Sequence, residues 1–233
     1  MQIFKAGSLA FFILNKYTPY TQPEVSVILT VYNRAHYLKR CIGSLLQQSF
    51  KNWELIAIDD GSEDNSFEVL KEYQFNHPRI KIIRHKNMKL PLSRNKGIMA
   101  SKGKFITFLD SDDEYARDHL LKRVEYLKSH PEVDMIRGGV NIIGNEYVRD
   151  KDNPIRFIHL SECSLGATFF GRRSVFLMLN GFKNLEYSED SDFLDRAEKC
   201  FLVEKVDFNT YRYYREAPDS ITNNYFRSVI PIS

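Results

Sequence analysis

The chain has 233 residues, 43% hydrophobic and 27% charged, which is the composition of a globular protein with one large domain or at most two small ones. Its formal net charge is only +3, and its basic residues are interleaved with acids, which argues against nucleic acid as a partner. The three cysteines, Cys41, Cys163 and Cys200, are far apart, so no zinc site of the usual spacing is expected and a reducing, cytoplasmic setting is favoured.

Residues 1–22 form an N-terminal extension that differs from the rest of the chain. Its apolar stretch, residues 9–14, is too short to span a bilayer. Two interpretations stay open. The stretch could be a short helix or strand packed on the domain, or it could contact the cytoplasmic face of a membrane, with Lys5 and Lys16 near anionic headgroups.

The first half of the following domain alternates strands with helices. Strands are predicted at 25–31, 53–58, 80–83 and 105–109, and helices at 37–49, 65–74 (with Asp64 as N-cap) and 93–101. Such alternation requires crossover connections and predicts an α/β fold, with a mainly parallel, Rossmann-like sheet and helices on both faces.

A helix is predicted at 116–128, and the pattern loosens after residue 131. Helices are then predicted at 173–179 and 188–199, and strands at 133–136, 140–143, 166–170, 201–206 and 211–215. No linker rich in Pro, Gly or Ser divides the chain. We therefore expect one domain over residues 23–233, with a regular first half (23–115) and an irregular second half (116–233).

Polar clusters follow three of the predicted strands. Tyr32-Asn33, Asp59-Asp60 and the acidic run 110–114 each begin where a strand ends. Ligands of parallel sheets bind outside the carboxyl ends of the strands, so these clusters are expected to share one crevice. No G-x-G-x-x-G follows the first strand, so a dinucleotide fingerprint is absent.

The acidic run contains Asp110, Asp112, Asp113 and Glu114. Two carboxylates about 4 Å apart repel by roughly 4 kcal/mol at an effective dielectric near 20, so either they face water or a cation lies between them. Asp112 or Asp113 could instead cap the following helix, but capping leaves Asp110 unexplained. Oxygen ligands without Cys or His are typical of Mg²⁺ or Mn²⁺, and we favour a metal site.

Two other clusters allow both a structural and a functional interpretation. Asp60 could accept hydrogen bonds from a nucleobase and Tyr32 could stack on it, or they could belong to a plain turn and an ordinary surface ring. Glu189-Asp190 could be catalytic, or could simply begin a helix capped by Ser188.

Four ordered segments resemble glycosyltransferase family 2, which has the GT-A fold: VSVILTVYNR, LIAIDDGSEDNS, LSRNKGIMASKGKFITFLDSDDEY and YSEDSDFLDR. The resemblance covers about residues 24 to 222. It implies an enzyme that transfers a hexosyl or N-acetylhexosaminyl group, with inversion, from a nucleotide-sugar (usually a UDP-sugar) to an acceptor hydroxyl. The acceptor would be a saccharide or a lipid-linked saccharide, in surface polysaccharide or glycolipid synthesis.

The resemblance also implies roles for individual residues. The metal, Mn²⁺ or Mg²⁺, would be held by Asp110, Asp112 and Asp113, and Asp190, beside Glu189, would be the catalytic base. The nucleotide-sugar would be held by Thr30, Tyr32, Asn33, Asp60, Arg94, Asp110 and Ser111. One departure is Ala217, at a position where relatives often have His.

The sequence also allows two rival functions. A nucleotidyltransferase also combines a nucleotide crevice with metal-binding carboxylates, but it usually has a Gly-rich basic loop where this chain has Thr-Val-Tyr-Asn-Arg. A non-catalytic nucleotide- or carbohydrate-binding module would not need Asp190 beside the metal site.

Overall fold

The computed structural model describes residues 22–150, 153 and 155–215. The apolar stretch 9–14 and Ala217 lie outside these residues, so the expectations attached to them stay open. Within the described part of the chain, no helix has both the length and the apolar character needed to cross a membrane.

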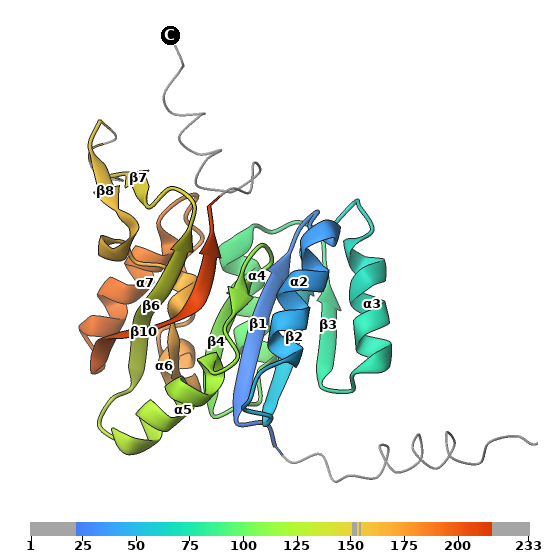
Figure 1. Ribbon diagram of the computed structural model, residues 1–233, viewed down its shortest axis with the longest axis horizontal. Helices are drawn as coiled ribbons and strands as arrows, with labels where there is room; N and C mark the ends of the chain where they lie inside the picture. Colours follow the sequence, from blue (N-terminus) through green and yellow to red (C-terminus); the bar gives the residue numbers. More distant parts are fainter. Residues whose placement is uncertain (1–21, 151–152, 154, 216–233) are drawn as a thin grey trace, which may run out of the picture.

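An eight-stranded sheet forms the centre of the molecule (Figure 1). Its strands in spatial order are β3 (Ile80–Arg84), β2 (Trp53–Asp59), β1 (Val25–Val31), β4 (Phe105–Asp110), β9 (Phe170–Arg172), β6 (Met135–Ile143), β10 (Val203–Tyr214) and β5 (Glu114–Tyr115). The four strands β3-β2-β1-β4 pair in parallel, and the second half of the chain adds both parallel and antiparallel pairs. A separate hairpin pairs β7 (Tyr147–Arg149) with β8 (Phe157–His159).

Helices cover both faces of the sheet, as predicted. One apolar core joins the sheet to α2 (Ala35–Leu46), α3 (Ser66–Asn76) and α5 (His119–Ser129). The other joins it to α4 (Leu90–Ala100), α6 (Arg173–Met178) and α7 (Glu189–Glu198). β1 and β2 are mostly apolar and almost wholly buried, because a strand between two helical layers has no face exposed to water.

The order of the strands fixes where a ligand can bind. The chain runs outward from β1 to β2 and β3, and then returns to place β4 on the other side of β1. This reversal opens a crevice beyond the carboxyl ends of β1 and β4. Tyr32 follows β1 and Asp110 ends β4, so the polar clusters predicted to converge do lie at the switch point.

The second half differs from the sequence prediction in how its strands are divided. The predicted strands at 133–136 and 140–143 belong to one strand, β6, and those at 201–206 and 211–215 belong to β10. The two long strands pair in parallel with a register shift between Val206 and Tyr211. Gly138 and Gly139, with φ of +89° and +70°, interrupt β6 opposite this register shift. The irregularity explains why the sequence pattern predicts two short strands in place of each long one.

The predicted strand at 166–170 is also different. Residues Gly166–Thr168 form a single 3₁₀ turn, η2, and only Phe170 belongs to β9. Another 3₁₀ turn, η1 (Leu160–Glu162), follows β8. The chain between β8 and β9 is therefore made of turns, and it lines the crevice described next.

Candidate active site

A pocket of about 510 Å³ occupies the crevice at the switch point. The strand ends of the first half form one wall, and the hairpin β7–β8, the turns after it and the start of α7 form the other. It brings together nearly all residues predicted from the sequence, namely Thr30, Tyr32, Asp60, Arg94, Asp110, Ser111, Asp112, Glu189 and Asp190. Asn33 and Asp113 are the two predicted residues that do not line it.

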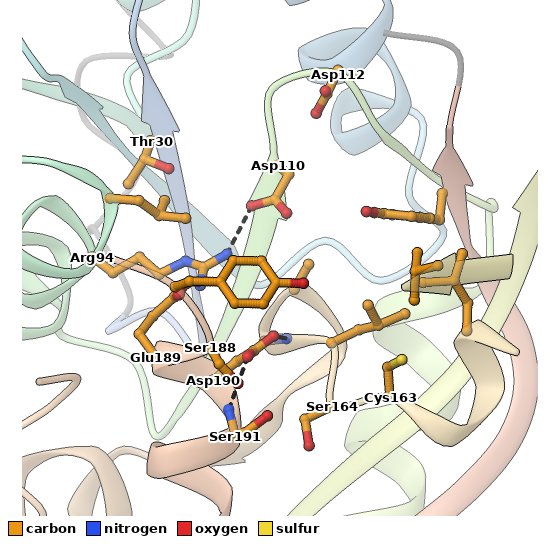
Figure 2. A pocket seen from close by; sticks show the side chains of 18 of the residues that line it. Thr30, Arg94, Asp110, Asp112, Cys163, Ser164, Ser188, Glu189, Asp190 and Ser191 are labelled. Atoms are coloured by element: carbon orange, nitrogen blue, oxygen red, sulfur yellow. Dashed lines mark hydrogen bonds and ion pairs between the residues drawn. The ribbon is translucent and has the colours of Figure 1, made fainter. Parts of the chain in front are cut away.

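Arg94 links the two walls (Figure 2). One guanidinium nitrogen lies 3.0 Å from Asp110 Oδ1, and the other terminal nitrogen lies 3.1 Å from Glu189 Oε1. Only 3% of Arg94 is exposed, so this cation is held in place by two carboxylates and by the rings of Phe108 and Phe182. The pairing places a fixed positive charge between the end of β4 and the start of α7.

Asp190 lies in the first turn of α7, next to this ion pair. Its Oδ2 accepts a hydrogen bond of 3.2 Å from the Gly166 backbone N–H, and its Oδ1 accepts one of 2.8 Å from Ser191. Burial, together with the charge of Glu189, raises the pKa of Asp190 to about 7, against a lowering effect of Arg94. A carboxylate whose pKa lies near neutrality is well matched to general-base catalysis.

The turn that holds Asp190 leaves no room for a side chain. A Cβ added to Gly166 would lie 3.0 Å from both Arg94 Nη1 and Asp190 Cβ. Gly166 therefore allows the backbone to approach the carboxylate closely. The sequence pattern, which favoured a strand here, did not identify this contact.

Tyr32 and Asp60 form the other end of the pocket. Tyr32 is 43% exposed and lines the pocket, as a stacking residue would. Asp60 is buried, and its Oδ1 accepts a hydrogen bond of 2.7 Å from the Met88 backbone N–H and lies 3.3 Å from His85 Nδ1. The sequence led us to expect that Asp60 hydrogen-bonds a nucleobase. In the structure, its Oδ1 already accepts a hydrogen bond from the loop before α4.

Asp113 departs from its expected role as a metal ligand. It is 1% exposed, and its two oxygens accept hydrogen bonds of 2.8 Å from the Tyr211 hydroxyl and 2.8 Å from the Tyr214 backbone N–H. Burial and the neighbouring charges of Asp112 and Asp110 raise its pKa well above the ordinary value. Asp113 thus fixes the acidic turn to β10, and the alternative of helix capping also fails, since α5 begins after Asp118.

Asn33 also has a structural role instead of the expected donor contact. It adopts a left-handed backbone with φ of 54°, and its Oδ1 accepts hydrogen bonds from the N–H groups of Glu63 and Asp64. The carboxylate of Asp64 in turn accepts hydrogen bonds from the backbone N–H groups of Ser66, at the start of α3, and of Ala35, at the start of α2. The N-cap position of α3 is Asn65, so Asp64 lies one residue before the position predicted for it. The side chains of Asn33 and Asp64 join the loops after β1 and β2, which keeps Tyr32 and Asp60 on the same side of the pocket.

Ser188 does not act as the helix cap considered from the sequence. It occupies the N-cap position of α7 but makes no side-chain cap hydrogen bond, and its φ of 63° is left-handed. The positive end of α7 therefore meets the carboxylates of Glu189 and Asp190 without a cap. Two acids in the first turn complement the positive end of a helix, so this arrangement agrees with both the structural and the functional interpretation of the pair.

The chain is similar in sequence to known glycosyltransferases. The family described as Glycosyl transferase family 2 matches residues 26–205, most of the chain. The chain belongs to this family. An uncharacterized glycosyltransferase from Haemophilus influenzae is 30% identical over 89% of this chain and 85% of its own length. The glycosyltransferase GlyA from Streptococcus pneumoniae is 30% identical over 72% of this chain but only 22% of its own length.

Other similar proteins extend beyond the region they share with this family 2 chain. TuaG from Bacillus subtilis, a putative teichuronic acid biosynthesis glycosyltransferase, is 36% identical over 46% of this chain and 42% of its own length. A crystal structure of S. aureus TarS 1-349 in complex with UDP-GlcNAc matches 85% of this chain and 60% of that one, with a TM-score of 0.69 and 18% identity. The mannosyltransferase PcManGT from Pyrobaculum calidifontis, in complex with GDP-Man and Mn²⁺, matches 94% and 66%, with a TM-score of 0.68 and 17% identity. These two structures show the GT-A type of fold.

The acidic turn of this family 2 protein fits a cation that is shared with phosphate oxygens. No group of three or more His, Cys, Asp or Glu side chains suited to a metal occurs among the residues that the structure describes. Mg²⁺ and Mn²⁺ bound beside phosphates, however, typically need only one or two protein carboxylates. Asp110 and Asp112 both line the pocket and supply that number, whereas Asp113 does not.

Several pocket residues were not identified from the sequence. Val148 and Ile158 line it from the hairpin β7–β8, and Tyr213, Tyr214 and Arg215 line it from the end of β10. No chemical motif marks these positions. The residues of β10 reach the pocket through the long pairing of β6 with β10, and Val148 and Ile158 reach it through the separate pairing of β7 with β8.

Proposed function

We propose that this family 2 protein transfers a hexosyl or N-acetylhexosaminyl group from a nucleotide-sugar, first of all a UDP-sugar, to an acceptor hydroxyl with inversion. The observation that carries the proposal is the arrangement across one pocket of a carboxylate with pKa near 7, Asp190, and the acidic turn of Asp110 and Asp112, with Arg94 between them. The acceptor is a saccharide or lipid-linked saccharide of surface polysaccharide or glycolipid synthesis, in line with the putative role of TuaG in teichuronic acid biosynthesis.

Asp190 serves as the catalytic base. Its ionised carboxylate removes the proton of the acceptor hydroxyl while that oxygen forms the new bond to the anomeric carbon. The bond between this carbon and the nucleoside diphosphate breaks in the same step, and the electron pair leaves with the diphosphate. A single base on the acceptor side is enough for such a direct displacement, which inverts the anomeric centre.

The donor occupies the wall opposite Asp190. Tyr32 stacks on the nucleobase, while Thr30, Asp60 and Ser111 contact the nucleoside, and Arg94 lies near the diphosphate. Asp110 and Asp112 would hold Mn²⁺ or Mg²⁺, which stabilises the negative charge of the departing diphosphate. We place the protein in the cytoplasm, with a peripheral contact at the cytoplasmic face of the membrane if its acceptor is lipid-linked.

Release of the leaving group tests this proposal. The full chain is incubated with Mn²⁺, a panel of UDP- and GDP-sugars, and saccharide or lipid-linked acceptors, and free nucleoside diphosphate is measured. Release that depends on an acceptor supports the transferase. Release of pyrophosphate instead would favour a nucleotidyltransferase, and binding without turnover for every donor would favour a binding module.

A further inference from the structure

A second groove of about 570 Å³ lies outside the active-site pocket and shares none of its lining residues. One wall is the exposed side of α2, and the other is the segment 114–117 with Arg212 of β10. The acidic turn after β4 separates the two cavities. Nothing in the proposed reaction makes use of this groove.

The groove is strongly basic. Its charged lining consists of Lys39, Arg40, Arg117, Arg212 and a single acid, Glu114. Glu114 is already neutralised, because its Oε1 lies 3.3 Å from Arg40 and its Oε2 lies 3.5 Å from Arg212. Lys39 and Arg117 have exposed side chains and pair with no acid in the described part of the chain. The field in the groove is therefore positive, although the whole chain carries only +3.

The walls of the groove are held together by hydrogen bonds. Gln48 donates to the carbonyl of Ala116 at 2.8 Å, the Ser49 backbone N–H donates to the carbonyl of Arg117 at 2.8 Å, and the Tyr115 N–H donates to Ser44 Oγ at 3.0 Å. The cations are thus carried on a fixed backbone. Between them, a Cβ added to Gly43 would meet no atom within 4 Å, so the space over α2 is open.

We propose that this groove binds a phosphate group, carried either by the headgroup of an anionic lipid or by a soluble phosphate compound. Two unpaired cations on opposite walls, one of them an arginine with several donors, suit an anion that accepts hydrogen bonds from more than one side. Lys39 and Arg117 are the principal phosphate ligands. Arg40 supports them from the end of the groove near the active site.

Arg40 also connects the groove to the acidic turn. Its guanidinium donates to the backbone carbonyl of Asp112 and lies 3.9 Å from the centroid of the Tyr214 ring. An anion in the groove would therefore contact the same side chain that braces Asp112. If the phosphate belongs to a lipid, the site would hold this edge of the active-site pocket close to a membrane.

The first experiment separates the two sources of phosphate. Full-length protein is sedimented with vesicles that contain phosphatidylglycerol and, separately, with vesicles of pure phosphatidylcholine. In parallel, inorganic phosphate is titrated while the amide NMR signals of Gly43 in the groove and Gly166 in the pocket are followed. A lipid site gives sedimentation with the anionic vesicles alone, and a soluble-phosphate site shifts Gly43 at concentrations that leave Gly166 unchanged.

The second experiment uses a matched pair of double variants. Lys39→Gln with Arg117→Gln removes two cations from the groove, and Lys96→Gln with Lys199→Gln removes two exposed cations elsewhere. Each cation close to an anionic membrane surface contributes about fivefold in affinity, so the groove variant should bind anionic vesicles about 25-fold more weakly. If soluble phosphate is the ligand, the same variant should weaken the response of Gly43 to phosphate. The control variant should bind like the wild type, and both should keep wild-type affinity for UDP.

Three results would overturn the site. These are no response to either probe, a Gly43 shift that only accompanies the Gly166 shift, and an equal loss of binding in the two double variants. The last result would mean that the whole surface charge, and not the groove, attracts the anion. Vesicle binding through residues 1–22 is distinguished in the same way, because it would be unchanged in the groove variant.

Discussion

Tyr211 donates a hydrogen bond of 2.8 Å to Asp113, and the same hydroxyl accepts one of 3.1 Å from the backbone N–H of Asp110. Tyr211 lies on β10, whereas Asp110 ends β4, and two other strands separate β4 from β10 in the sheet. Tyr211 and Asp113 are both buried. One phenol therefore ties the second half of the domain to the turn that carries Asp112.

Replacement of Tyr211 by Phe should affect both stability and metal binding. The change leaves a buried Asp113 oxygen and the Asp110 N–H without partners, and each unsatisfied group costs about 1–3 kcal/mol. We expect a lower free energy of unfolding in urea and a weaker apparent affinity for Mn²⁺ in the presence of UDP. Tyr147→Phe, at a 53% exposed position, is the control. Unchanged metal affinity in a destabilised Tyr211→Phe protein would limit this residue to a role in folding.

Removal of Asp112 should separate metal-dependent from metal-independent binding. UDP is expected to bind weakly without a divalent cation, because the diphosphate and the carboxylates of Asp110 and Asp112 would then repel one another. Asp112→Ala should reduce the affinity for UDP in Mn²⁺ and abolish transfer. Asp118→Ala, which removes an exposed carboxylate paired with Lys122, should change neither. Calorimetry that gave the same wild-type affinity with chelator as with Mn²⁺ would rule out the metal site.

The elements around the switch point could be predicted because local pattern and tertiary context agree there. β1, β2 and β4 are mostly apolar and buried on both faces; β2 ends at Asp59, β4 ends at Asp110, and Tyr32 follows the end of β1. The alternation with helices then fixes the parallel order, so Tyr32, Asp60 and Asp110 could be placed at one edge from the sequence alone.

Roles within the polar clusters could not be predicted to the same degree. Asp112 and Asp113 are chemically identical neighbours, but Asp112 lines the pocket while Asp113 is buried against Tyr211, a partner 98 residues away in the chain. Asn33 and Tyr32 both follow β1 and were expected to bind the donor, and only the contacts of Asn33 with the loop after β2 show that it braces that loop. Only long-range contacts distinguish a binding residue from a bracing one in these pairs.

The rate of transfer should depend on pH through Asp190. Its pKa of about 7 results mainly from burial and then from the charge of Glu189, and only its ionised form can accept a proton. The rate should therefore rise with pH and level off above about 7. Glu189→Gln removes the like charge, lowers the pKa of Asp190 and should move the rising limb of the pH–rate profile to lower pH. A profile that did not move would mean that another group controls it.

The free energy of unfolding should also depend on pH through Asp190. An ion-paired carboxylate with a lowered pKa makes a protein more stable as pH rises, whereas Asp190, with a raised pKa, should make it less stable. Asp190 in the unfolded chain loses its proton near the ordinary value of 3.8, but in the folded protein only near 7. Between these values the unfolded state binds fewer protons, so the contribution of Asp190 lowers the free energy of unfolding as pH rises. Asp190→Asn lacks this effect. Its urea midpoint, relative to wild type, should be higher at about pH 8 than at about pH 4, and a constant difference would contradict the assigned pKa.

Asp190→Asn also provides the sharpest test of catalysis. The amide keeps nearly the same shape but cannot accept the proton of the acceptor hydroxyl. General-base catalysis contributes about 100- to 10,000-fold, so kcat should fall by at least about 100-fold. Loss of an interaction made only in the transition state leaves the ground-state donor complex intact, so the affinity for UDP with Mn²⁺ should stay near wild type.

The matched control for this variant is Glu198→Gln. It makes the same carboxylate-to-amide change on the same helix, at a side chain that is 45% exposed and 3.4 Å from Arg137, away from the pocket lining. Both proteins are assayed for UDP affinity by calorimetry and for sugar transfer to the acceptor found in the donor screen. Glu198→Gln should transfer at the wild-type rate. Near wild-type transfer by Asp190→Asn as well would mean that the base lies elsewhere in the pocket, with Glu189 and Asp195 as the carboxylates to test next.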